Sequence, residues 1–403
     1  MTKTVNNKNL LNQPLILPCG EILKNRIVKS AMSDSLSDGE GSPTDAQIRL
    51  YEKWAEGGVA LSIVGEVQID PRFPENTGNL VLNNNANLQD LKLLTTRAKI
   101  NGTHIWPQLG HAGGLSHSPI STPKGPSHLK IGDFECEGMS TQEVSALPND
   151  FAKAALLAKE VGFTGVQIHA GHGFLLSQFL SPLFNRREDQ YGGSIEARCK
   201  IIVDIIGKVR SIVGNSFPIG IKINCTDQLQ GGLTEQDALI AIGILDKTSI
   251  DLIELSGGSY FPGAESSSDS LTKGPYFINF AAKSKKITNI PITVTGGFKT
   301  REEAINTLQT NSSDMVGIAR ALVLNPNLVN NWLNEVNDDP KFPRFKTPPE
   351  GGITAWYTMR INAIGNDTEN HFDLDLPSAL QAYKQRDKQR DKQRCIKWLA
   401  KFA

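Results

Sequence analysis

The sequence lacks the features that mark several large classes of protein. None of its apolar runs is long enough to cross a bilayer, and the N-terminal stretch MTKTVNNKNLLNQP has no apolar segment of the signal-peptide kind. The five cysteines are scattered without a CxxC pair, which argues against a disulfide scaffold, a zinc site and an iron–sulfur cluster. These absences predict a protein without a metal site in a reducing compartment, the cytoplasm.

An excess of charge of one sign is also missing. The 42 Lys and Arg residues balance the 42 Asp and Glu residues, so the formal net charge is zero. Nucleic acid and membrane surfaces are therefore not expected as partners. A small-molecule substrate is expected, and the protein could form a homo-oligomer. No GxGxxG motif follows an apolar run, which argues against a separate dinucleotide-binding domain.

The sequence does contain short apolar runs that alternate about eight times with segments of helical periodicity. This alternation predicts βα units and a parallel sheet, and we expect a (β/α)8 TIM barrel. Helices are expected over 87–101, from Asn149 as N-cap to 161, and from Thr234 as N-cap to 247. The expected strands are 27–32, 59–65, 103–109, 165–169, 219–224, 252–255, 292–295 and 315–319.

The two ends of the chain add to this barrel. A Cys19-Gly20 turn predicts an N-terminal β-hairpin that closes the barrel bottom. We expect one domain over 1–403, with the barrel at about 10–340 and a C-terminal helical extension at 341–403. The extension contains the repeat KQRDKQRDKQR over 384–394, which predicts a solvated, salt-bridged helix, with nucleic-acid binding as the less favoured alternative. The apolar residues expected to dock after it are Ile396, Trp398, Leu399 and Phe402.

Basic residues and a glycine pair follow three late apolar runs. Lys222, Gly296-Gly297 and Arg320 would all lie at the carboxyl ends of barrel strands, where the loops after strands seven and eight often bind phosphate. Glycine lets the backbone approach a phosphate, and arginine offers it a fork of donors. The residues themselves leave Lys222 open as a cofactor contact, a Schiff-base former or a salt-bridge partner.

Beyond these patterns, the sequence resembles the Old Yellow Enzyme-type NADH:flavin oxidoreductases and NADH oxidases. The resemblance extends from about Leu10 to Trp332 and implies a barrel that binds FMN noncovalently and is reduced by NAD(P)H. It also implies hydride transfer through the flavin to the activated C=C bond of an α,β-unsaturated carbonyl compound. The matching segments, in family order, are LKNRIVKSAM, PQLGHAG, GVQIHAGHGFLLSQFLSPLFNRREDQYGGSIEAR, IGIKIN, ITVTGGF and VGIAR.

The resemblance further implies which residues surround the flavin. Gln108 would face the pyrimidine edge, and Lys222 would lie near N1 and O2, where reduction places negative charge. Ala319 stands where the family usually has glycine, and Glu66 stands where a small or amide residue is common, so Glu66 has no assigned role. The other positions expected to contact FMN are Ala31, Met32, Ser33, Gly296, Gly297 and Arg320.

On the substrate side, the resemblance implies that His169 and His172 bind the carbonyl or phenolate oxygen of the ligand. The chain departs from the family at Phe174, where most members have the tyrosine that protonates the substrate. Phenylalanine cannot donate a proton, so Tyr260 or water would have to serve instead. A second departure is HAGG at 111–114, where HAGR is usual.

Three alternatives stay open at this point. The first is an NAD(P)H oxidase whose acceptor is dioxygen or a quinone, which the departure at Phe174 favours. The second is a phosphate-binding barrel lyase that uses Lys222 as a Schiff base. The third is a flavin-binding protein without reductase activity.

Overall fold

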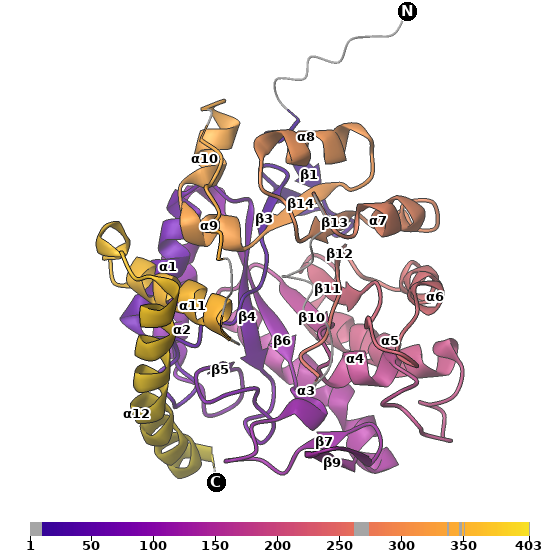
Figure 1. Cartoon of the computed structure of the whole chain (residues 1–403). Coiled ribbons are helices and arrows are strands. Elements are labelled where there is room, and N and C mark those ends of the chain that lie inside the picture. The colour runs from indigo at the N-terminus through magenta and orange to yellow at the C-terminus, as the bar shows by residue number, and fades with distance from the viewer. Residues whose placement is uncertain (1–9, 262–273, 337, 346–348, 350, 403) are drawn as a thin grey trace, which may run out of the picture.

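A closed parallel barrel forms the centre of the computed structural model, which describes residues 10–261, 274–336, 338–345, 349 and 351–402 (Figure 1). The strand order is β3-β14-β13-β12-β11-β10-β6-β4, and pairing of β3 with β4 closes the ring. The (β/α)8 barrel is therefore confirmed. Its strands are β3 (Ile27–Lys29), β4 (Leu61–Gln68), β6 (His104–Gly110), β10 (Val166–Ala170), β11 (Ile219–Asn224), β12 (Leu252–Ser256), β13 (Ile292–Thr295) and β14 (Met315–Ile318). A short strand, β5 (Leu80–Val81), pairs with the end of β4.

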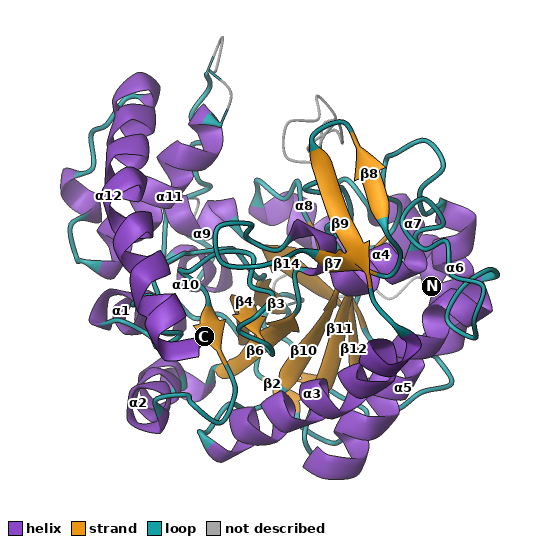
Figure 2. Cartoon of the chain, turned by 90° about the horizontal axis from the view of Figure 1, so that it is seen from below, coloured by secondary structure: helices purple, strands orange, loops and turns teal. Residues whose placement is uncertain are grey.

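Helices surround the barrel, so nearly every strand residue is buried on both faces (Figure 2). The helices are α1 (Asp45–Glu56), α2 (Leu88–Ala98), α3 (Thr141–Glu160), α4 (Leu175–Leu180), α5 (Ile195–Val213), α6 (Glu235–Leu245), α7 (Ile278–Ser284), α8 (Arg301–Gln309), α9 (Arg320–Leu324), α10 (Leu328–Leu333), α11 (Gly352–Gly365) and α12 (Leu376–Phe402). Short 3₁₀ turns lie at Ile100–Gly102, Gly113–Leu115 and Glu369–His371.

The two ends of the barrel differ in chemistry. At the amino ends of the strands, Trp106, Ile63 and Leu252 form an apolar plug. The predicted hairpin, β1 (Leu15–Ile16) paired with β2 (Ile22–Leu23), closes this end and adds its own leucines to the plug. Polar residues are therefore concentrated at the carboxyl ends, where barrel enzymes carry their active sites.

The loop between β6 and α3 has a structure of its own. It contains the three-stranded sheet of β7 (Lys124–Gly125), β8 (Leu129–Ile131) and β9 (Phe134–Gly138). In the loop that follows β12, residues 262–273 lie outside the described part of the chain.

The predicted start of α3 is wrong. The helix begins at Thr141, whereas an N-cap at Asn149 would have started it at Asp150, nine residues later. Pro148 lies inside the helix. Ser140 and Glu143 form a reciprocal capping box at its start, which supplies partners for the first free N–H groups. By contrast, the predicted N-cap Thr234 is confirmed, because its side chain accepts from the backbone N–H of Asp237.

The charged tail is helical as predicted, but its inner face is not solvated. Residues spaced by four along α12, Arg390 and Arg394, face the loop after β3 and donate to its backbone. Arg394 is therefore only 8% exposed. Trp398 docks as expected and is buried. Ile396 was expected to dock as well and does not, since it is 62% exposed. Leu399 and Phe402 remain partly exposed but line a groove with Trp398 against the loop at Pro71. In the described part of the chain, no helix combines the length and apolar character needed to cross a membrane.

Candidate active site

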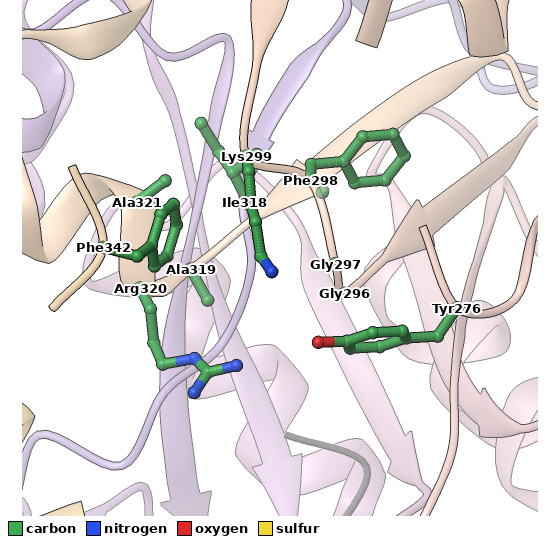
Figure 3. A pocket seen from close by; sticks show the side chains of 11 residues that line it. Tyr276, Gly296, Gly297, Phe298, Lys299, Ile318, Ala319, Arg320, Ala321 and Phe342 are labelled. Atoms are coloured by element: carbon green, nitrogen blue, oxygen red, sulfur yellow. The ribbon is translucent and has the colours of Figure 1, made fainter. Parts of the chain in front are cut away.

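A pocket at the ends of β13 and β14 brings together the residues predicted to hold phosphate (Figure 3). Gly296 and Gly297 have φ values of +110° and +85°, and a Cβ on Gly297 would lie 2.4 Å from the Gly274 carbonyl oxygen. The backbone itself therefore forms this wall. The Arg320 guanidinium, 5.6 Å from the Tyr357 ring centre, and the Lys299 ammonium both reach toward the opening, where a dianion would meet two cations. Ala319 also lines the pocket.

A buried polar network lies below this pocket, inside the barrel. Lys222 Nζ is 3.2 Å from Glu254 Oε1, and both side chains are almost fully buried. Gln108 donates to Gln167 at 2.7 Å, and Gln167 donates to Glu254 at 2.6 Å. Thr295 donates at 2.8 Å to Glu254 Oε1, the same oxygen that faces Lys222. The amide and the cation expected to face the flavin are thus joined through one carboxylate.

The charge state of Glu254 follows from this network. Burial opposes its ionisation, but the charge of Lys222 and the hydrogen bonds from Gln167 and Thr295 outweigh burial and lower its pKa. Lys222 therefore has an ionised partner, which confirms the salt-bridge interpretation of this lysine.

The segment that follows β3 lies against β4 at the same end of the barrel. Gly65 packs directly on Met32, since a Cβ at Gly65 would lie 2.0 Å from the Met32 carbonyl oxygen. Ala31 and Ser33 flank this contact and are partly exposed. β3 itself ends at Lys29, three residues before the predicted end. Glu66, directly after Gly65, is buried.

His169 and His172 are brought together at the end of β10. His169 Nε2 and His172 Nδ1 lie 3.3 Å apart, and His172 Nε2 lies 3.0 Å from the Ser256 hydroxyl. Burial, reinforced by the charge of Lys222, lowers the pKa of His169 to about 3 and that of His172 well below its usual value. Both rings are therefore neutral at neutral pH, and each carries one N–H.

Two aromatic rings stand beside the histidines. The Phe174 ring centre is 5.1 Å from that of His169, and the Tyr260 ring centre is 5.8 Å from that of His172. Phe174 and Tyr260 are themselves 5.7 Å apart. Tyr260 is 65% exposed, so its hydroxyl belongs to an open wall of the site. Among the described residues, no group of three or more His, Cys, Asp or Glu side chains is placed to hold a metal ion.

The arrangement fits FMN on the evidence of these contacts. The glycine-walled pocket with Arg320 and Lys299 suits the terminal phosphate, and a Cβ at either pocket glycine would press on neighbouring atoms. Lys222 and Gln108 supply a cation and an amide edge in the interior. Fold and site together define a flavin-binding TIM-barrel oxidoreductase.

Comparison with known proteins gives the family. The profile of the NADH:flavin oxidoreductase / NADH oxidase family matches residues 11–339, and the chain belongs to that family. It is an FMN-dependent oxidoreductase of the Old Yellow Enzyme type that takes electrons from NADH or NADPH. The lyase alternative is thereby wrong.

Individual relatives agree with this assignment. The NADH-dependent flavin oxidoreductase iliE of Hypocrea jecorina is 33% identical over 386 residues, which cover 85% of this chain and 95% of that protein. The NADPH dehydrogenase of Clostridium acetobutylicum is 29% identical over 80% of this chain and 94% of its own length. Among solved structures, morphinone reductase has a TM-score of 0.71 at 23% identity, covering 83% of this chain and 92% of that one, which supports the fold.

Several residues of the site were missed by the sequence interpretation. Of these, Glu254 was the easiest to predict from the sequence, because a lone carboxylate inside the apolar strand 252–255 must have a buried partner. Lys299 follows the glycine pair by two positions, but lysines are common in loops and nothing distinguishes this one. Gln167 carries no local signal, since its role depends on contacts between neighbouring strands.

Proposed function

We propose that the protein reduces the activated C=C bond of α,β-unsaturated carbonyl compounds at the expense of NAD(P)H. The observation that carries this proposal is the pair of neutral histidines, His169 and His172, at the end of β10 beside Lys222. A neutral imidazole N–H can donate a hydrogen bond to a carbonyl oxygen and polarise the C=O bond without transferring its proton. When bound, FMN supplies the two-electron step, by taking hydride from the nicotinamide and passing it to the β-carbon of the alkene.

The chain's own residues would divide the remaining work. The substrate oxygen would take the place of the contact between the two imidazole rings and accept their N–H groups. Lys222, held by Glu254, would stabilise negative charge at the flavin edge, which develops during reduction. Phe174 and Tyr260 would form the wall that confines the substrate, and Ala31, Met32 and Ser33 the wall beside the ring system.

A second function has one observation in its favour. Phe174 removes the usual proton donor, so an enzyme whose acceptor is dioxygen or a quinone would lose nothing by this change. The absence of that tyrosine therefore favours an NAD(P)H oxidase or quinone reductase as the alternative.

Steady-state assays with product analysis decide between the two. The purified, FMN-loaded enzyme is supplied anaerobically with NADH or NADPH and with 2-cyclohexenone, a nitroalkene or a benzoquinone, and separately with air. The proposal predicts a saturated product in a one-to-one ratio to oxidised nicotinamide. Consumption of nicotinamide only with air or the quinone would establish the alternative.

A further inference from the structure

Glu66 occupies an unusual position at the end of β4. The pairing of β4 with β6 shifts register between Val64 and Val67, and Glu66 has a φ of +53°, which side-chain-bearing residues rarely adopt. Its side chain is 5% exposed, and within the described structure its Oε2 atom has no hydrogen-bond partner. Strained backbone at a buried polar residue is frequent where a side chain serves function.

Glu66 differs from its neighbour Glu75 in the donors it meets. Glu75 Oε2 accepts from Asn76 at 2.5 Å, from Asn79 at 3.1 Å and from Ser33 at 3.5 Å. Glu66 Oε2, by contrast, meets no donor among the described residues. A buried carboxyl that lacks donors is destabilised as a carboxylate, so these surroundings favour the protonated form of Glu66.

The environment favours the protonated form of Glu66. Burial raises the pKa of Glu66 well above its usual value, and the charge and hydrogen bond of Glu75 raise it further. The charge of Lys222 acts in the opposite direction without reversing the shift. The neutral carboxylic acid is therefore the favoured form of Glu66 in the folded protein.

Glu66 also lies at the same end of the barrel as the histidine pair. It follows Gly65, which packs directly on Met32, and its neighbour Glu75 accepts from Ser33. β4 and β10 run parallel in the barrel, so Glu66 and the histidines both lie near the carboxyl ends of these strands. The acid is thus placed beside the segment expected to line the flavin, while Phe174 offers no proton to the substrate.

We propose that Glu66 donates the proton that completes reduction of the alkene, an inference that rests on the function proposed above. Hydride forms the new C–H bond at the β-carbon, and the C=C electron pair moves toward the carbonyl to give an enolate. The O–H bond of Glu66 then breaks as a C–H bond forms at the α-carbon, which leaves Glu66 as a carboxylate. Glu75 is partly exposed and returns a proton to it from solvent.

A carboxylic acid suits this task better than the other candidate, the phenol of Tyr260. A phenol has an ordinary pKa of about 10. A general acid works best when its pKa lies near the operating pH, and a phenol lies well above it.

The kinetic test compares Glu66→Gln with Tyr260→Phe by anaerobic stopped-flow oxidation of the NADH-reduced enzyme with 2-cyclohexenone. Glu66→Gln should slow this step by about 10²–10⁴-fold, the usual contribution of a general acid. Tyr260→Phe should lose less, and Phe174→Tyr in the Glu66→Gln background should recover part of the rate. A Glu66→Gln rate equal to wild type, or a larger loss in Tyr260→Phe, would overturn the proposal.

The wild-type result separates the two proposals. If wild type reduces the enone and Glu66→Gln does so equally well, only the role of Glu66 fails. If wild type does not reduce any activated alkene, the proposed function fails, and the donor role fails with it.

Thermal unfolding without added nicotinamide supplies a second measurement that does not depend on turnover. Glu66 stays protonated in the folded chain but ionises in the unfolded chain above about pH 4.3, so its contribution to stability falls as pH rises through that range. Glu66→Gln removes this loss. The melting temperature of Glu66→Gln minus that of wild type should therefore increase steadily between pH 5 and pH 8. If this difference does not change with pH, Glu66 is ionised in the folded protein and the donor role is refuted.

Discussion

At the scale of single residues, the pairing of Lys222 with Glu254 would set the charge that a bound flavin meets, if Lys222 faces the flavin as we propose. The lysine is fully buried, and its 3.2 Å contact with an ionised carboxylate leaves the pair close to neutral. The remaining Glu254 hydrogen bonds come from Gln167 and Thr295, so the carboxylate is held in place from both sides. Substitution of either charged partner should therefore change the flavin potential, and the two changes should have opposite signs.

Lys222→Met removes the cation and should lower the two-electron potential of bound FMN, because the reduced flavin loses its stabilising charge. Glu254→Gln leaves the cation without its counter-charge and should raise the potential. Each 30 mV corresponds to about 1.4 kcal/mol for a two-electron couple. Spectroelectrochemical titration of folded, FMN-loaded variants measures both values. Shifts of the same sign would show that the pair does not act on the flavin electrostatically.

The histidine pair allows a second prediction at this scale. Para-substituted phenols mimic the enolate oxygen, and a phenolate held over oxidised flavin produces a long-wavelength charge-transfer band. Replacement of His169 and His172 by Ala should abolish that band at phenol concentrations that saturate wild type, while FMN stays bound. Phenol titrations followed by absorbance test this directly. Unweakened phenol binding in the double variant would place the oxyanion site elsewhere.

At the scale of elements, α12 is bound to the loop that follows the segment expected to line the flavin. Arg390 and Arg394 both donate to the Ser35 carbonyl oxygen, at 3.1 and 3.0 Å, two residues beyond Ser33. Gly39 leaves room for this contact, since a Cβ there would lie 2.6 Å from the Arg394 side chain. The C-terminal helix therefore holds the loop after β3 in position.

Arg394→Ala should lower the free energy of unfolding by about 1.5–3 kcal/mol, the usual worth of a hydrogen bond that involves a charged group. Lys392→Ala is the matched control, because Lys392 lies on the exposed face of the same helix and its loss should change stability by no more than about 0.5 kcal/mol. Denaturant unfolding followed by circular dichroism measures both. Equal effects of the two substitutions would mean that the contact with Ser35 does not stabilise the fold.

The elements also show what the sequence could and could not predict. All eight barrel strands were located, because buried parallel strands read as continuous apolar runs. The start of α3 was missed because Pro148 interrupts the pattern that Ser140 and Glu143 begin. The inward turn of Arg394 was missed because a charge repeat carries no sign of which face will be covered. Burial of such a face depends on the loop after β3, more than 350 residues away in the chain.

At the scale of the whole molecule, the barrel separates an apolar bottom from a polar mouth. The hairpin and Trp106 close one end, and the residues expected to hold the flavin gather at the other. α11 packs on α1 and on α9, and α12 follows it in the chain (Figure 1). These contacts support our proposal that the chain forms one domain, with the extension packed against the barrel.

The residues of the site were predictable to differing degrees. The phosphate pocket and the pairing of His169 with His172 follow from residues close in sequence at strand ends. The surroundings of Glu66 and Glu75 did not, because Glu75 takes its donors from Asn76, Asn79 and Ser33, and Ser33 reaches it only in the folded chain.

The central claim is that hydride leaves this enzyme for an activated alkene, and a single-turnover experiment tests it most directly. The FMN-loaded enzyme is reduced anaerobically with one equivalent of NADH or NADPH and then mixed with 2-cyclohexenone. We predict return of the oxidised-flavin absorbance at a rate that increases with enone concentration, with one cyclohexanone formed per flavin. A flavin that stays reduced with this enone and with a nitroalkene, yet is reoxidised promptly by dioxygen or a quinone, would contradict the account.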